Sequence, residues 1–144
     1  MKIVGGKWLK DRNRYDSEMC LANGWECIQG RHYDVLINNK KVEVKKTKSS
    51  SAIIKLQQLA EIVLQPELSD IFYLFIRTDK MQNSILDAIQ IKALDLSKHV
   101  GMTPDMAEKI IYLHQSFKCT IQTSVVINDI KSHCNFESYN EVTK

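Results

Sequence analysis

The 144-residue sequence lacks any long apolar run, internal repeat, low-complexity tract or evident linker. No stretch approaches the ~18 apolar residues that a membrane-spanning helix needs, so no membrane partner is expected. The N-terminal apolar run is too short for a secretory signal. Cysteine is scarce, and the four cysteines show no CxxC spacing. A disulfide framework or a zinc site is therefore not indicated, and we expect buried free thiols in a reducing cytoplasm.

A strong excess of charge of one sign is also absent. The 20 Lys and Arg residues face 17 Asp and Glu residues, which leaves a formal net charge of +3. This charge is unevenly distributed, because residues 1–48 carry a net +5 and residues 49–144 a net −2. Such an asymmetry can mark a region that faces a polyanion. The 44% hydrophobic and 26% charged residues are close to the globular average, and the length suits a single domain, 1–144.

The hydrophobic pattern predicts an α/β domain whose first part runs in the order α-β-β-β-α-β. Apolar residues spaced three or four apart indicate helices, whereas alternating or β-branched runs indicate strands. The serines at 49–51 are expected to cap the second helix, and Pro66 is expected to end it. The predicted helices span 8–22 and 52–64, and the predicted strands span 25–29, 33–39, 40–48 and 71–77.

Residues 81–144 are expected to form a C-terminal extension that packs on or beside a core at about 8–80. Residues 84–94 are compatible with either a strand or a helix. Two short helices are predicted at 94–101 and 103–116, a strand is predicted at 119–129, and the last dozen residues are expected to be frayed. Thr103 followed by Pro104 is typical of a helix start.

The segment most informative about chemistry is D-V-L-I-N-N-K-K-V-E-V-K at residues 34–45. A hairpin turn between its two strands would bring Asp34 beside the Glu43 end of the second strand. The two-residue period of a strand puts Glu43 and Lys45 on one face. Two carboxylates and an ammonium group then converge, which suits metal-assisted phosphodiester hydrolysis. Asp34, Glu43 and the Val44 carbonyl would bind Mg²⁺ or Mn²⁺, and Lys45 would orient or activate water or stabilise charge on phosphorus.

D-x8-E-x-K on adjacent strands, with a helix before it and a helix and a buried strand after it, resembles the PD-(D/E)XK nuclease superfamily. The resemblance covers roughly residues 8–80. It implies a three-layer, restriction-endonuclease-like αβββαβ core on a small mixed sheet, and a Mg²⁺-dependent endonuclease that acts on DNA. Asp34 and Glu43 would be metal ligands and Lys45 the catalytic lysine.

The same resemblance implies two auxiliary positions. A carboxylate from the first helix, for which Glu18 is the candidate, would be a further metal ligand, and a glutamine after the lysine would be Gln57 or Gln58. The family's leading proline is replaced by Tyr33. The short length and the N-terminal helix resemble Holliday-junction resolvases and Mrr-like restriction nucleases most.

Basic residues around the predicted hairpin are candidates for phosphate contacts with DNA. The alternative is a solvated edge hairpin whose lysines block strand addition. No organic cofactor is indicated. Cleavage of both strands of a duplex, or of a junction, would need two active sites, so a homodimer is expected. The candidate DNA-binding residues are Lys46, Lys48, Lys55, Arg12, Arg14 and His32.

Two alternatives to a nuclease remain open from the sequence. One is a catalytically inactive DNA-binding module with the same fold. The other is a helix-turn-helix regulator that uses residues 94–116, with Gly101 in the turn and Ala107 and Ile110 at apolar positions of the second helix. Two helices that cover a sheet would explain the same pattern, since the exposed face of the second helix offers Asp105, Glu108 and Lys109.

Overall fold

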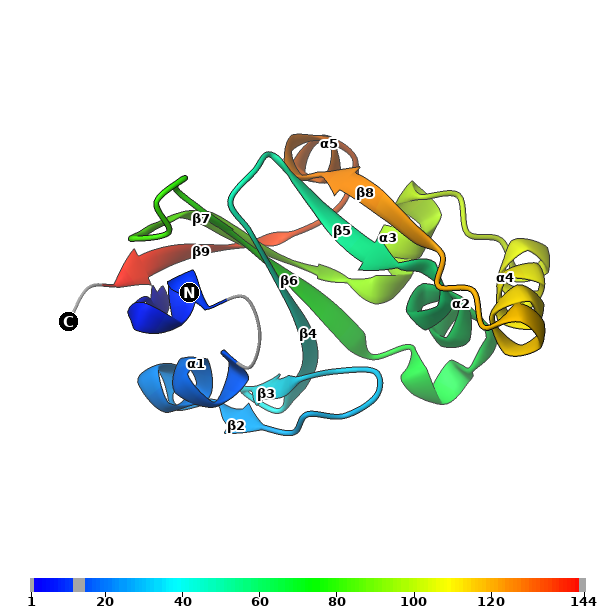
Figure 1. The fold of residues 1–144 in the computed structure, drawn as a ribbon, viewed down its shortest axis with the longest axis horizontal. Helices are drawn as coiled ribbons and strands as arrows, with labels where there is room; N and C mark the ends of the chain where they lie inside the picture. The colour runs from blue at the N-terminus through cyan, green and yellow to red at the C-terminus, as the bar shows by residue number, and fades with distance from the viewer. Residues whose placement is uncertain (1, 12–14, 143–144) are drawn as a thin grey trace.

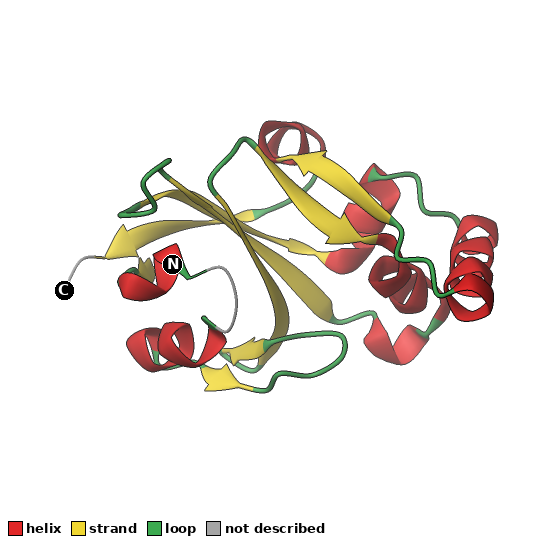
Figure 2. Ribbon diagram, in the orientation of Figure 1, coloured by secondary structure: helices red, strands yellow, loops and turns green. Residues whose placement is uncertain are grey.

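The computed structural model describes residues 2–11 and 15–142, and they form an α/β fold (Figures 1 and 2). A mixed seven-stranded sheet has the strand order β1-β9-β7-β6-β4-β3-β2, and β5 pairs with β8 in a separate two-stranded sheet, the β5–β8 ribbon. The α/β class predicted from the hydrophobic pattern is confirmed. The strands are β1 (Lys2–Val4), β2 (Glu26–Cys27), β3 (Val35–Ile37), β4 (Lys40–Thr47), β5 (Ser51–Lys55), β6 (Ile71–Thr78), β7 (Ile85–Lys92), β8 (Gln122–Val126) and β9 (Glu137–Val142).

The helices lie mainly at the two ends of the molecule, with α1 at one end and α2, α3 and α4 together at the other (Figure 1). Across the described ranges, none of them has the length and apolar character needed to cross a membrane. Thr103 caps α4 by accepting a hydrogen bond from the backbone N–H of Met106, as predicted. The helices are η1 (Lys7–Lys10), α1 (Asp16–Asn23), α2 (Leu56–Leu64), η2 (Pro66–Leu68), α3 (Ala93–His99), α4 (Pro104–Phe117) and α5 (Ile127–His133).

The predicted hairpin is present as β3 and β4. These strands pair antiparallel with Val35 opposite Val42, and the turn residues Asn38 and Asn39 both have positive φ angles, of 51° and 66°. Asparagine tolerates this conformation, which the tightest hairpin turns require. On its other edge β4 pairs parallel with β6, with Glu43 opposite Tyr73. β4 is therefore an interior strand of the sheet.

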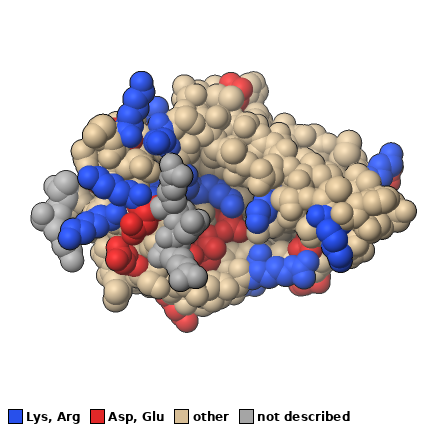
Figure 3. Space-filling view, in the orientation of Figure 1, with Lys and Arg blue, Asp and Glu red and all other residues tan. Residues whose placement is uncertain are grey.

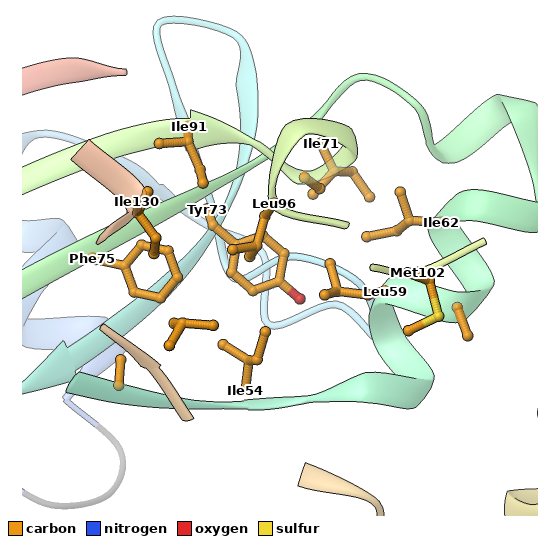
Figure 4. Close-up of a cluster of buried hydrophobic side chains, with 14 of the residues drawn as sticks. Ile54, Leu59, Ile62, Ile71, Tyr73, Phe75, Ile91, Leu96, Met102 and Ile130 are labelled. Carbon is orange, nitrogen blue, oxygen red and sulfur yellow. The ribbon is translucent and has the colours of Figure 1, made fainter. Parts of the chain in front are cut away.

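Two hydrophobic clusters lie on the two faces of the sheet. One includes Val42 and Val44 of β4 with η1 and α1, and it contains the buried Trp8 and Met19. The other joins β6 and β7 to α2, α3, α4, α5 and the ribbon, and Figure 4 shows Tyr73 in it between strand and helix side chains. Residues beyond 80 thus supply β7 and β9 to the same sheet and a large part of this second cluster.

The helix predicted over 8–22 is wrong in its first half. The chain forms the short 3-10 helix η1, and α1 begins only at Asp16. Residues 12–14 lie outside the described ranges. Trp8 and Leu9 are buried in the hydrophobic cluster that includes α1 and Val42, so their apolar spacing reflects this packing rather than a continuous helix.

The helix predicted to begin at residue 52 is also wrong over its first turn. Residues 51–55 form β5, and α2 begins at Leu56. Ala52 and Ile54 are buried while Ile53 and Lys55 are exposed, which is the alternation of a strand. The partner, β8, lies about 70 residues further along the chain in an antiparallel register. The pairing of β5 with a strand so distant in sequence outweighed the helix-like spacing of its apolar residues.

The C-terminal segment differs from expectation as well. Residues 137–142 form β9 instead of a frayed end, and β9 pairs with β7 and β1. Residues 84–94 were compatible with a strand or a helix, and most of them form the strand β7. The strand predicted over 119–129 is shorter, since β8 ends at Val126 and α5 follows directly.

Replacement of Tyr139 by Phe tests how β9 is held. The Tyr139 hydroxyl donates to Gln90 Oε1 on β7 at 2.6 Å, and both side chains are buried. Tyr139→Phe leaves a buried acceptor unpaired, so we expect the free energy of unfolding to fall by about 1–3 kcal/mol in denaturant titration. Tyr112→Phe is the matched control, because Tyr112 is exposed on α4. Equal stability of both variants and the wild type would contradict this account.

Candidate functional site

The structure brings Asp34 and Glu43 together at the open end of the β3–β4 hairpin. Asp34 precedes β3, and its backbone N–H donates to the Val42 carbonyl at 2.9 Å. Its side-chain Oδ2 accepts from the backbone N–H of Val44 at 2.9 Å. The Asp34 carboxylate is thus held against the segment of β4 that carries Glu43 and Lys45. The two carboxyl groups share a hydrogen bond.

Glu43 is an acid in an unfavourable place for a negative charge. Its side chain is only 5% exposed, and it lies on the face of β4 opposite to the buried Val42 and Val44. Burial first, then the hydrogen bond and the charge of Asp34, raise the pKa of Glu43 to about 9. The Lys45 ammonium acts in the opposite direction. The pair therefore holds a proton at neutral pH unless another cation replaces it.

The carboxylate that α1 brings to this site is Asp16, whereas Glu18 is exposed. Burial raises the pKa of Asp16, Asp34 raises it further, and Lys45 lowers it. Asp16 therefore interacts electrostatically with both Asp34 and Lys45. A helical signal could have identified it: Asp16 lies three and four residues before the buried Met19 and Cys20 and shares their face. Glu18 falls on the other side of the helix.

Lys45 lies between two adjacent hollows in the surface. One, of about 480 Å³, is lined by Asp11 and Tyr15 and by residues 44–48 at the end of β4 and directly after it. The other, of about 300 Å³, is lined by Lys45, Lys46 and Thr47 and by residues of the ribbon. Lys45 is half-buried, lines both hollows and is close enough to Asp16 and Glu43 to affect their pKa. A substrate can approach it from the surface.

Lys46 holds the N-terminal segment rather than standing free. Its ammonium donates to the carbonyls of Trp8, Leu9 and Asp11 at 3.0, 2.6 and 2.5 Å, and it lies 4.5 Å from the centre of the Tyr15 ring. Burial lowers the pKa of Lys46, which Asp11 opposes. All three N–H donors of the ammonium group have acceptors within the protein. In this arrangement Lys46 therefore has no free donor for the predicted contact with a phosphate.

The other predicted DNA-binding residues are dispersed. His32 Nε2 is 2.6 Å from Glu61 Oε2 on α2, and Arg31 pairs with the same carboxylate, so this histidine faces α2. Lys48 and Lys55 are exposed and make no ion pair within the described part of the chain. Arg12 and Arg14 lie outside the described residues.

Three buried polar atoms on α2 and β6 have no hydrogen-bond partner among the described residues: Gln57 Oε1, Gln58 Oε1 and the Tyr73 hydroxyl. Tyr73 is opposite Glu43 in the ladder, and burial, then Glu43 and Asp34, raise the pKa of its hydroxyl. The Gln58 amide donates to the Arg31 carbonyl at 3.4 Å. These atoms can still bond to groups brought into the site. Tyr73 had no signal in the sequence beyond a place in an apolar strand.

The residues present fit a hard divalent cation in chemical type. Mg²⁺ is usually held by one or two carboxylates and completes its shell with water and substrate phosphate oxygens. Asp34 and Glu43 supply such a pair, and the crowding of Asp16 nearby favours a positive charge. Within residues 2–11 and 15–142, no group of three or more His, Cys, Asp or Glu side chains is arranged to hold an ion. The Val44 carbonyl lies between Glu43 and Lys45 in the chain.

The helices predicted at 94–101 and 103–116 correspond to α3 and α4. Ala107 and Ile110 of α4 are buried in the cluster that contains α2, and α4 packs against α2. This packing accounts for the apolar spacing that suggested a helix-turn-helix. The exposed side of α4 carries Met106, Tyr112 and Phe117.

Replacement of Lys46 tests whether its ammonium group clamps the N-terminal segment, that is, whether its hydrogen bonds to that segment stabilise the fold. Lys46→Met leaves three carbonyls without their charged donor, so we expect the free energy of unfolding to fall by about 2 kcal/mol. Lys48→Met is the matched control on the same strand end, and its effect should stay within about 0.5 kcal/mol. Chemical denaturation followed by circular dichroism measures both. A Lys46→Met variant as stable as the control would contradict the clamp.

The raised pKa of Glu43 predicts that the free energy of unfolding, measured with a chelator present to remove divalent cations, depends on pH. Between the ordinary pKa of 4.5 and about 9 the folded state keeps a proton that the unfolded state releases, so stability falls as pH rises. The slope contributed is up to about 1.4 kcal/mol per pH unit. Glu43→Gln removes this titration and flattens the curve, whereas exposed Glu108→Gln keeps the wild-type slope. Identical curves for Glu43→Gln and wild type would refute the assignment.

The grounds for assigning a function are the geometry and charge of this site. Two carboxyls in hydrogen-bonded contact, a lysine two residues along the same strand and a third carboxylate from α1 lie at the end of one hairpin. The chain matches no protein-family model, and no curated protein is significantly similar to it.

Proposed function

We propose that the chain is a Mg²⁺-dependent DNA endonuclease with an active site of the PD-(D/E)XK type. The observation that carries the proposal is the contact between Asp34 and the buried Glu43, with Lys45 beside them on β4. The order α1, β2, β3, β4, α2, β6, with β4 parallel to β6, is compatible with a restriction-endonuclease-like core. β5, inserted between β4 and α2, departs from that order.

Each residue has a distinct part in the proposed reaction. Asp34, held by the Val44 N–H, and Glu43 would ligate the cation, and Asp16 would add negative charge or bind an outer water. When bound, the cation acidifies water and neutralises charge on the phosphate. Lys45 would orient the attacking water or stabilise the negative charge that develops on the phosphoryl oxygens.

The charge distribution supports a polyanionic substrate. On the face shown in Figure 3, acidic side chains lie among groups of Lys and Arg side chains. A nuclease needs this combination, because basic residues attract the phosphate backbone while acids hold the metal. Lys48 and Lys55 are the exposed lysines without an ion pair that follow Lys45 most closely in sequence among the described residues. Cleavage of two strands would be achieved by a two-fold homodimer with two sites.

Cleavage assays test the proposal directly. Asp34→Ala and Lys45→Met are expected to lose at least about 100-fold in cleavage rate, because each removes a group that acts on the phosphate or its metal. Plasmid, nicked, flapped and four-way-junction DNA serve as substrates with Mg²⁺, with Mn²⁺ and with EDTA. Asp105→Ala, which changes an exposed acid on α4, should retain full activity.

Three results would overturn the proposal. Absence of metal-dependent cleavage on every substrate, with DNA binding intact, would favour an inactive DNA-binding module. Full activity in Asp34→Ala would place the chemistry elsewhere. Sequence-specific binding lost only on substitution in α4 would favour the helix-turn-helix regulator instead.

A further inference from the structure

The β5–β8 ribbon begins where the candidate site ends. Only three residues, 48–50, separate β4 from β5, and this connection is tightly bonded. The Thr47 hydroxyl donates to the Ser51 carbonyl at 2.7 Å, the Ser49 hydroxyl donates to the same carbonyl at 2.8 Å, and the Ser51 N–H donates to Ser49 Oγ at 3.2 Å. The ribbon and the exposed Lys48 at its corner are therefore held in a defined position relative to Lys45.

The two faces of the ribbon differ in character. Ala52, Ile54 and Val125 are buried against the sheet and explain why the ribbon packs there. The outward face pairs Ile53 with Ser124 and Lys55 with Gln122. Ile53 is 60% exposed, and Val126, which pairs with Ser51 on the same outer face, is 40% exposed. Core packing does not account for this outer face.

The hollow beside Lys45 continues onto this outer face. Lys45, Lys46 and Thr47 line both of the adjacent hollows, and the second one extends to Ser51, Ile53 and Ser124. No Asp or Glu among the described residues lines the second hollow. A concave tract thus leads from Lys45, two residues along β4 from Glu43, to a wall of hydroxyls and the exposed Ile53 side chain.

From this juxtaposition we propose that the outer face of the β5–β8 ribbon binds the sugar–phosphate backbone of the DNA that flanks the scissile phosphate. Lys48 and the hydroxyls of Ser51 and Ser124 contact phosphate oxygens, and Ile53 packs against a deoxyribose. Lysine and serine are common phosphate-contacting residues, and these contacts carry no base preference. The ribbon therefore sets the direction in which the substrate leaves the site. The inference rests on the proposed nuclease function for the nature of its substrate.

Charge changes at Ser124 test this inference without disturbing the fold, because Ser124 is exposed. Binding is measured by fluorescence anisotropy in EDTA with a 30-base-pair DNA duplex, and in parallel with the single strand. Ser124→Glu should weaken binding about tenfold, and Ser124→Lys should strengthen it. Lys48→Ala should reduce the slope of log affinity against log salt by about 1. The DNA, duplex or single strand, whose affinity changes more between these variants is the form whose backbone the ribbon binds.

Ser69→Glu is the matched control, since Ser69 is exposed and precedes β6 at the end opposite to Thr47. Its affinity should equal that of the wild type, and melting temperatures should be equal for all variants. Equal binding by Ser124→Glu and Ser69→Glu, or no DNA binding by the wild type, would overturn the ribbon assignment. Cleavage by Asp34→Ala at the wild-type rate would instead overturn the nuclease proposal, so the two failures are distinguishable.

Discussion

The register of β4 is the constraint on which the rest of the structure depends. β4 pairs antiparallel with β3 on one edge and parallel with β6 on the other, so its position is specified twice. Val42 and Val44 then enter the cluster that includes α1, and Glu43 and Lys45 point to the opposite face. A shift of one residue would exchange these faces and bury both charges among apolar side chains. Hydrophobic packing and the location of the site are thus decided together.

The site concentrates like charge at the cost of stability. Burial and then the Asp34 carboxylate raise the pKa of both Asp16 and Glu43, and Lys45 is the cation that opposes these shifts. A buried acid of this kind contributes nothing to folding that an apolar residue would not supply better. Acids whose pKa is strongly perturbed by burial and by a neighbouring charge are typical of functional sites. The same crowding that opposes ionisation would be relieved by a bound divalent cation.

Lys46 shows how one residue next to the site can serve the fold instead. Its three carbonyl partners fix η1 and Asp11 to β4, and its ammonium group also contacts the ring of Tyr15, the residue directly before α1. The segment that delivers Asp16 is therefore anchored to the strand that delivers Glu43. Side chains at 45 and 46 point to opposite faces of β4, which separates chemistry from anchoring within two residues.

The local pattern was sufficient for the hairpin and for the buried strand β6. Two asparagines at a turn, alternating valines and a continuous apolar run have the same meaning in almost any context. The pairing of Asp34 with Glu43 followed from that hairpin alone. The position of β4 in the middle of the sheet was not predicted, because its parallel pairing with β6 joins segments that are distant in sequence.

Tertiary structure decided the elements whose partners lie far away in sequence. β5 has helical spacing but pairs with β8, and β9 has a weak pattern but is held by β7 and β1. The choice of Asp16 over Glu18 depended on which face of α1 meets the sheet, and the use of Lys46 depended on carbonyls of η1. The sequence by itself determined which charged residues share a hairpin, because that contact is local. Only the folded chain decided which helix face, which lysine and which ribbon surround it, because those contacts join segments that the local pattern cannot align.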